Sequence, residues 1–394
     1  MFDVAIVSAV RTPIGNFGGA LKDVSAAQLG EVVAREAIKR AKLSPEMVDE
    51  TIFGCARQAG NGPNIARQIA FHSQIPVEKV AYTVNKACGS GLKSITLGAQ
   101  SIMLGENQVI LAGGIEQMSQ IPYLLLKARW GYRLGNDTLV DSNYRDGYFC
   151  PLADMLMGET VDRLAEDYKI SRKEQDEFAA ESNQKASAAW DNGSFNSEVV
   201  PVEVKGSKTT TLFTRDEHPR SDSSGEKLAK LKTVFRPEEE GGTITAANAS
   251  GITDGAAAVI LMREELARAE GIEPLAVIKG FASAGVEPAR MGLAPIPATR
   301  KVLAQTNTRL EDFDLIELNE AFAAQVLIVE KELAWDPERR NINGGAVALG
   351  HPTGCSGARI LVTLLHAMKN RDAELGLATL CISGGLGMSI VLQR

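Results

Sequence analysis

Strand-like apolar runs alternate with amphipathic stretches along the first 119 or so residues of the chain. A short continuous apolar run is typical of a buried strand, whereas apolar residues at helical spacing are typical of a helix packed on one face. The alternation predicts an α/β arrangement. The predicted elements are strands over residues 4–9, 50–53, 80–84 and 109–114, and helices over 25–41, 63–72 and 92–103.

The pattern changes between about residues 120 and 250, where aromatic, charged and polar residues mix and one long helical stretch spans 171–190. A strand is predicted over 256–262, and α/β alternation resumes from about residue 273. We therefore expect a domain inserted into the first of two α/β parts. The expected boundaries are 1–119 with 251–272 for the first part, 120–250 for the insertion and 273–394 for the second part.

Two short segments of the first part resemble segments of the second part. SGLK at residues 90–93 resembles SGAR at 356–359 at an offset of 266, and the strand at 109–114 resembles residues 378–385 at an offset near 271. Similar offsets from separate motifs favour a duplication. Strings this short and rich in glycine also match by chance, which is the alternative.

Composition narrows the class of protein. Apolar residues make up 44% and charged residues 23%, and no apolar run approaches the roughly 20 residues of a membrane helix. The first residues predict a strand rather than a signal peptide, so we expect a cytoplasmic protein. A net charge of −7 gives no general electrostatic reason to bind nucleic acid. Five cysteines without a C-x-x-C pair argue against a disulfide framework and a structural zinc site, and we expect no metal.

Two clusters of basic residues stand out against the acidic background. Either cluster can hold a phosphorylated small molecule, and the alternative is an ordinary solvated face. The clusters are Lys127, Arg129, Arg133 and Arg145, and Arg220, Lys227, Lys230 and Lys232.

Cys88 is the first candidate for chemistry. It lies in the string ACGSG, between the predicted strand 80–84 and the predicted helix 92–103. Unpaired amides at the start of a helix favour negative charge, and the glycines allow a tight turn and close approach by a substrate. Cys88 is therefore expected to act as a thiolate nucleophile.

Three further candidates lie in glycine-rich or polar segments. His351 is either a base or oxyanion donor, or a structural residue, and its loop lacks the G-K-[ST] ending of a phosphate-binding loop. Cys381, at the end of a strand predicted over 377–381, is either a packing residue or a reactive thiol. Asn319 follows a strand predicted over 314–317 and is either a helix cap or an amide that positions water.

Four segments, in order along the chain, resemble the thiolase family: CGSGLKS at Cys88, NEAFAAQ at Asn319, GGAVALGHPTGCSGAR around His351 and CISGGLG at Cys381. Similar segments elsewhere extend the resemblance over essentially the whole chain. The resemblance implies a thiolase fold, in which two duplicated α/β halves form five αβαβα layers. It also implies that the inserted loop domain covers coenzyme A.

The family further implies ping-pong condensation of two acetyl-CoA to acetoacetyl-CoA and CoA, and the reverse thiolysis. Cys88 would take the acyl group with His351 as base, and Cys381 would deprotonate the second acetyl-CoA. His351 and a water held by Asn319 would face the thioester oxygen. The backbone amides of Cys88 and Ser383 would face the oxygen of the tetrahedral intermediate. Many thiolases have glycine where this chain has Ser383.

Coenzyme A is expected as substrate and product, with no separate cofactor. The matching positions imply Arg220 for its adenine and phosphate end. Lys227, where family members often have a small polar residue, is a further position implied for coenzyme A. Leu156, beside Met157, stands where short-chain biosynthetic members commonly have histidine, which affects how pantetheine or acyl groups sit. A homodimer or homotetramer is also implied, with Arg133 contributed by a neighbouring subunit. The pantetheine tunnel would be lined by Ala246, Ser250, Met291 and Phe322.

Three alternatives are open at this point. A broader-chain 3-ketoacyl-CoA thiolase of fatty acid β-oxidation has the same catalytic set. A ketoacyl synthase shares the fold and a cysteine nucleophile, but Cys381 and the GHPTG and NEAFAAQ strings favour a thiolase. A non-catalytic lipid carrier or scaffold with this fold is disfavoured, because Cys88, His351 and Cys381 are all present.

Overall fold

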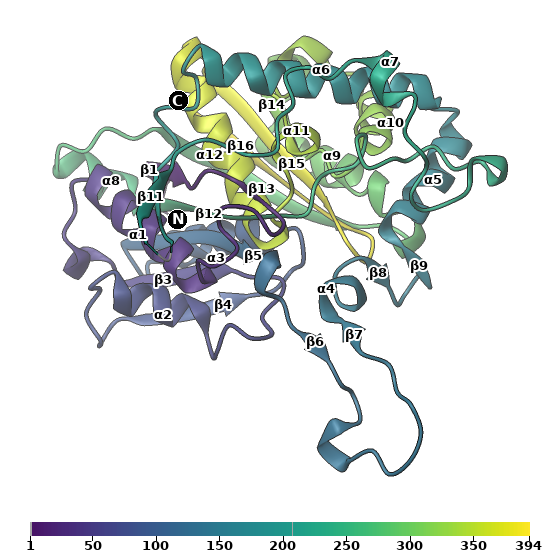
Figure 1. The fold of residues 1–394 in the computed structure, drawn as a ribbon. Helices are drawn as coiled ribbons and strands as arrows, with labels where there is room; N and C mark the ends of the chain where they lie inside the picture. The colour runs from purple at the N-terminus through teal and green to yellow at the C-terminus, as the bar shows by residue number, and fades with distance from the viewer. Residues whose placement is uncertain (1, 207) are drawn as a thin grey trace.

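A mixed sheet forms the centre of the computed structural model, which describes residues 2–206 and 208–394 (Figure 1). Its strands are β1 (Val4–Arg11), β2 (Gly15–Asn16), β3 (Glu50–Gly54), β4 (Val80–Val84), β5 (Val109–Gln117), β12 (Thr253–Arg263), β13 (Ala276–Gly285), β14 (Leu315–Leu318), β15 (Leu375–Ile382) and β16 (Leu386–Gln393). They follow the order β14-β15-β16-β13-β1-β12-β5-β3-β4, and β2 pairs with β12 beside this path.

The pairing of the strands repeats between the two parts of the chain. β3 and β5 are parallel, β5 and β12 antiparallel, and β12 and β1 antiparallel. In the second part β14 and β15 are parallel, β15 and β16 antiparallel, and β16 and β13 antiparallel. Two register pairs, Ala5↔Val277 and Ile6↔Ala276, join the parts edge to edge. A pattern shared by four strands in each part favours duplication over chance resemblance of short strings.

Two helices pack between the two parts of the sheet. They are α3 (Ser90–Leu104) and α12 (Thr353–Arg371), which contact each other, and α12 contacts both β5 and β15. Glycines permit this approach, since a Cβ on Gly114 of β5 would lie 2.2 Å from the carbonyl oxygen of Gly354 and 2.9 Å from Cα of Gly91. Strand β5 continues past the predicted end at residue 114, and Gly114 lies where α3 and α12 meet it.

Helices on the two outer faces complete five layers. The first part is covered by α1 (Ala26–Arg40) and α2 (Ile65–His72), and the second by α9 (Pro295–Thr306) and α10 (Ala323–Leu333). The inner faces of both sheet parts share one core with α3 and α12, while the outer helices cover separate cores. This is the αβαβα arrangement that the resemblance to the thiolases implied.

The described part of residues 120–250 adds no strand to the central sheet. It contains three hairpins, β6 (Tyr123–Leu124) with β7 (Val140–Asp141), β8 (Phe149–Cys150) with β9 (Met155–Leu156), and β10 (Val202–Lys205) with β11 (Thr210–Phe213). Its helices are α4 (Ser142–Arg145), α5 (Met157–Tyr168), α6 (Arg172–Asp191) and α7 (Gly225–Leu228), and the remaining helices are α8 (Glu264–Ala269) and α11 (Ala346–Leu349).

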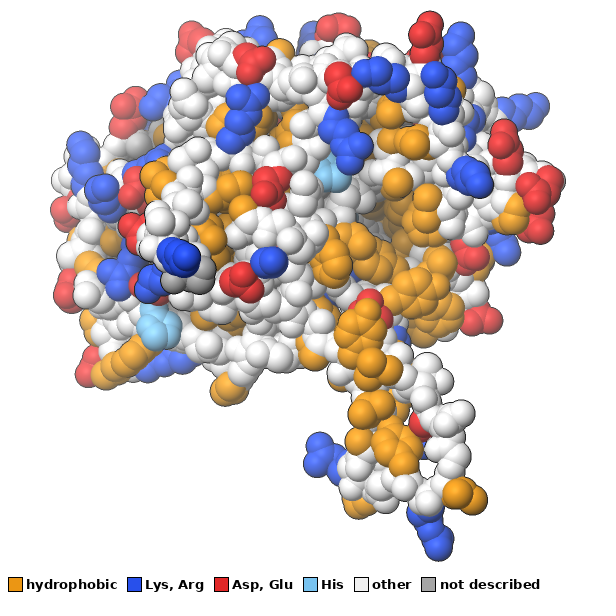
Figure 2. Space-filling model, viewed as in Figure 1, with side chains coloured by type: hydrophobic (Ala, Val, Ile, Leu, Met, Phe, Trp, Pro, Cys, Tyr) orange, Lys and Arg blue, Asp and Glu red, His pale blue; other side chains and the backbone are white. Residues whose placement is uncertain are grey.

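The stretch between β6 and β7, which we call the arm, stands away from the body of the protein (Figure 1). Apolar side chains gather on it (Figure 2). Over residues 2–206 and 208–394, the helices all fall short of the length and apolar character needed to cross a membrane.

Candidate active site

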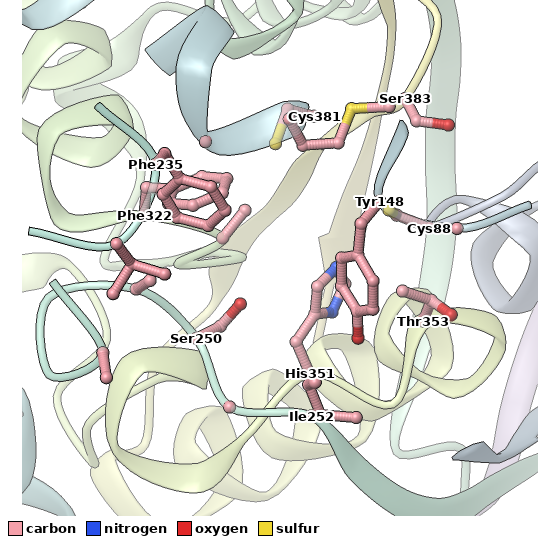
Figure 3. A pocket seen from close by; sticks show the side chains of 18 of the residues that line it. Cys88, Tyr148, Phe235, Ser250, Ile252, Phe322, His351, Thr353, Cys381 and Ser383 are labelled. Carbon is pink, nitrogen blue, oxygen red and sulfur yellow. The ribbon is translucent and has the colours of Figure 1, made fainter. Parts of the chain in front are cut away.

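A cavity of about 260 Å³ collects side chains from distant parts of the chain (Figure 3). Most of its lining is apolar, with a few polar and titratable groups, which is typical of ligand pockets. Cys88, His351 and Cys381, predicted from three separate segments, all line this cavity. Ser383 lines it as well, so the fold brings together all of the predicted catalytic residues except Asn319.

Cys88 lies in a sharp turn between β4 and α3, as the sequence predicted. Ala87 before it has a φ of 45°, a left-handed conformation that few residues with a side chain adopt, and Gly89 after it is the N-cap of α3. A Cβ on Gly89 would lie 2.3 Å from Cδ1 of Ile382, so this glycine lets the end of β15 approach the turn. The backbone amide of Ser383, just after β15, favours the ionised form of the Cys88 thiol.

The two thiols of the cavity are protonated in the resting site. Burial raises the pKa of Cys88, although the Ser383 amide and the Arg57 guanidinium act in the opposite direction. Burial, and after it the nearby Cys88, raises the pKa of Cys381 far above its usual range. The sequence predicted a thiolate favoured by the start of α3, but burial outweighs that effect. Cys88 therefore needs a base.

His351 presents a free lone pair at this site. Its Nδ1 lies 2.5 Å from Oγ of Ser356, and Ser356 donates its hydroxyl hydrogen to the carbonyl oxygen of Pro352 at 3.0 Å. With the hydroxyl hydrogen assigned to that carbonyl, Ser356 accepts from Nδ1–H and the lone pair is on Nε2. Nε2 has no hydrogen-bond partner among the described residues. Burial, followed by the charges of Arg57 and Arg359, lowers the pKa of His351 to about 3, so the imidazole is neutral at pH 7.

The raised pKa of Cys88 predicts how its alkylation depends on pH. Cys88 is partly exposed through the cavity, whereas the other four cysteines are buried. We expect iodoacetamide to modify Cys88 first, at a rate that still increases above pH 8.5, roughly the usual pKa of a thiol. Peptide mass spectrometry over a pH series measures this rate. A rate that is already maximal at pH 7 would contradict the raised pKa.

Asn319 does not line the cavity, although Ala321 and Phe322 beside it in the chain do. The helix-cap interpretation is wrong, because α10 begins at Ala323 with Phe322 as its N-cap. The side chain of Asn319 is fully buried, and neither of its amide atoms has a hydrogen-bond partner among the described residues. A buried amide is costly unless a water or ligand satisfies it, which favours the interpretation that Asn319 positions water.

The residues predicted for coenzyme A fall into two adjoining cavities. A second cavity of about 280 Å³ is lined by Arg220 and Lys227, and it shares Ala246 with the first. Leu156 lines neither cavity and pairs with Phe149 in the β8–β9 hairpin. Arg133, from the other basic cluster, is exposed on the arm. The predicted residues that line the first cavity are Met157, Ala246, Ser250, Met291 and Phe322.

Sequence reasoning missed a buried network beneath the cavity. Glu116 of β5 accepts hydrogen bonds from the N–H of Arg57 at 3.0 Å and from the N–H of Gly354 at 2.8 Å. It also accepts from the Thr353 hydroxyl at 2.6 Å. The oxygen of that hydroxyl in turn accepts a hydrogen bond from the Arg57 guanidinium. The guanidinium lies 5.1 Å from the ring centroid of Tyr148, which lines the cavity. A glutamate that directly follows the apolar run of β5 was the available signal in the sequence.

Comparisons with known proteins agree over the full length. Residues 4–265 match the family model of the thiolase N-terminal domain, and residues 272–394 match that of the thiolase C-terminal domain. The chain is 53% identical to an acetyl-CoA acetyltransferase of Escherichia coli K12, with 100% of each covered. It is 49% identical to a probable acetyl-CoA acyltransferase of Staphylococcus aureus strain COL, with the same coverage.

Two solved structures are similar over the whole chain. The acetyl-CoA acetyltransferase of Bacillus anthracis has a TM-score of 0.97 at 46% identity, covering 100% of this chain and 99% of that one. Human mitochondrial 3-ketoacyl-CoA thiolase has a TM-score of 0.96 at 41% identity, with the same coverage. Because the two scores are nearly equal, the backbone does not separate these two kinds of enzyme.

Proposed function

The chain belongs to the thiolase family, and we propose that it is an acetyl-CoA C-acetyltransferase, which joins two acetyl-CoA into acetoacetyl-CoA and CoA and catalyses the reverse thiolysis. The observation that carries this proposal is the meeting of Cys88, His351 and Cys381 in one cavity. Full-length similarity to proteins named acetyl-CoA acetyltransferase supports the four-carbon reaction in particular.

In the first half-reaction the sulfur of Cys88 attacks the carbonyl carbon of acetyl-CoA, and Nε2 of His351 takes the thiol proton. The backbone amides of Cys88 and Ser383 stabilise the oxygen of the tetrahedral intermediate. The bond to the coenzyme A sulfur then breaks, and Cys381 gives its proton to the leaving thiolate. An acetyl group is left on Cys88, with His351 protonated and Cys381 ionised.

In the second half-reaction the Cys381 thiolate removes a methyl proton from another acetyl-CoA. Burial raises the pKa of Cys381, which makes its thiolate a strong base. Protonated His351 and a water on Asn319 stabilise the enolate oxygen. The carbanion attacks the acetyl carbon on Cys88, acetoacetyl-CoA forms, and His351 returns its proton to the released Cys88 sulfur. Every group is then back in its starting state.

Coenzyme A would span the two adjoining cavities. Arg220 and Lys227 would hold its phosphates, and pantetheine would pass Ala246 to reach Cys88. Residues 120–250 supply Arg220, Lys227 and Ala246, which supports their role as a coenzyme A-covering loop domain.

We further propose a cytoplasmic homodimer or homotetramer. On the arm, Trp130 is 87% exposed and Leu134 fully exposed, and soluble proteins usually bury apolar surfaces of this kind in an interface. The arm is therefore the surface we expect to contact a second copy of the chain. The five free cysteines fit a reducing compartment.

The assignment is tested by thiolysis with coenzyme A of acetoacetyl-CoA, 3-ketohexanoyl-CoA and 3-ketodecanoyl-CoA. We expect kcat/KM for the four-carbon substrate to exceed the others by about tenfold or more, because a snug pocket rejects extra methylenes by that order. Comparable activity on the longer chains would instead support a 3-ketoacyl-CoA thiolase of β-oxidation, the kind of enzyme that the human structural relative is named for. Absence of thiolysis on all three would overturn the proposed function.

A further inference from the structure

Tyr148 stands at the reacting end of the catalytic cavity. In Figure 3 its ring lies on the same side as Cys88 and Thr353, across the cavity from Phe235 and Phe322. Phe322 belongs to the wall proposed for pantetheine. An acyl group carried on the Cys88 sulfur would therefore meet the Tyr148 ring on the side away from pantetheine.

Contacts on several sides hold Tyr148 in place. Its N–H donates to the carbonyl oxygen of Tyr144 at 3.0 Å, and its carbonyl oxygen accepts from the N–H of Met157 at 2.8 Å. The Arg57 guanidinium lies 5.1 Å from the ring centroid, within the range of a cation–π interaction. A Cβ on Gly147 would lie 1.9 Å from Nη2 of Arg57, so this glycine admits the guanidinium close to the backbone.

Arg57 is itself anchored, which makes the ring a fixed wall rather than a mobile flap. The guanidinium is buried, donates to the Thr353 hydroxyl and lies 3.7 Å from the Glu116 carboxylate. Its Nε and Nη2 have no hydrogen-bond partner among the described residues, so the Tyr148 ring is an important neighbour of this buried cation. Moving the ring would remove that interaction at a cost in free energy.

We propose that Tyr148, held against Arg57, is a specificity-determining residue that closes the acyl end of the cavity and restricts the reaction to short acyl groups. The inference rests on the proposed acyl transfer through Cys88 and names its substrate class. Cys88, Tyr148 and Thr353 line the same side of the cavity, so the ring stands beside an acyl group carried on the Cys88 sulfur.

The test compares kcat/KM for 3-ketooctanoyl-CoA with that for acetoacetyl-CoA in wild type and three variants. We expect Tyr148→Ala to raise the eight-carbon to four-carbon ratio by about tenfold or more, since several methylenes gain space. Tyr148→Phe should keep the wild-type ratio, because the wall acts through its ring. Tyr144→Ala is the matched control, since that side chain is 52% exposed, lies in the same segment and is absent from the cavity lining.

An unchanged ratio in Tyr148→Ala, with acetoacetyl-CoA thiolysis retained, would overturn the inference and leave the proposed function standing. A wild type that cleaves both substrates equally would overturn it too. Absence of thiolysis in wild type would instead remove the proposed function. If Tyr148→Ala does not fold, Tyr148→Leu tests the inference in its place. Leucine keeps an apolar side chain against Arg57 but is shorter than tyrosine, so it leaves more space at the acyl end of the cavity. Its expected increase in the ratio is roughly threefold.

Discussion

Replacing Cys88 with alanine should lower kcat/KM for acetoacetyl-CoA thiolysis by a factor on the order of 10⁴–10⁶, the usual range for losing a covalent nucleophile. Without the sulfur no acyl-enzyme forms, and Nε2 of His351 has no thiol proton to take. Substrate binding should change far less, because the cavity and its neighbour keep their walls. Steady-state kinetics together with mass spectrometry of the protein after acetyl-CoA treatment measure both effects.

Cys355→Ala is the matched control for this loss. Cys355 is buried in α12 within the central core and does not line the cavity. We expect that variant to keep most of the activity and to lose some stability from the small space left by the sulfur. Acetylation of the Cys88→Ala protein at another residue with normal turnover would show that Cys88 is not the nucleophile.

Local signals were sufficient to predict most elements. The helix expected over 25–41 is α1, where Ser25 caps the first turn and Gln28 completes a capping box. Contacts between remote segments were not predictable in the same way. The approach of Gly114 to Gly354 brings together two chain segments that are 240 residues apart. Nothing in the sequence of either segment indicates that it contacts the other. The glycines are visible in the sequence, whereas their partners come from the fold.

The same distinction separates the site residues that sequence reasoning identified from those that it missed. Cys88 and His351 carry their own signal, a reactive side chain set among glycines. Arg57 and Tyr148 have no such local signal, because each is positioned at the site by contacts with a distant segment of the chain. Asn319 shows the opposite error. Its residue type and position fit a cap, but β14 ends at Leu318 and α10 begins only at Ala323.

Replacing Cys381 with alanine should separate the two half-reactions. Cys88, His351 and Ser356 are untouched, so acetyl-CoA should still acetylate Cys88, though more slowly because the leaving thiolate loses its proton donor. The condensation step should fall further, by about 10²–10⁴-fold, since no positioned base removes the methyl proton. Cys381→Ser should resemble the alanine variant, because a hydroxyl is too weak an acid to supply the base.

The decisive measurement follows the acetyl group on the peptide that contains Cys88. In Cys381→Ala this peptide should accumulate the acetyl mass while acetoacetyl-CoA formation stays low, and in Cys88→Ala it should carry none. If Cys381→Ala instead made acetoacetyl-CoA within tenfold of the wild-type rate, the base would be another group. Of the titratable groups lining the cavity, His351 and Tyr148 would be left. His351 already carries the Cys88 proton at this step, and burial raises the pKa of Tyr148, so that its hydroxyl keeps its proton. The high pKa that burial gives Cys381 is therefore what suits it to this step.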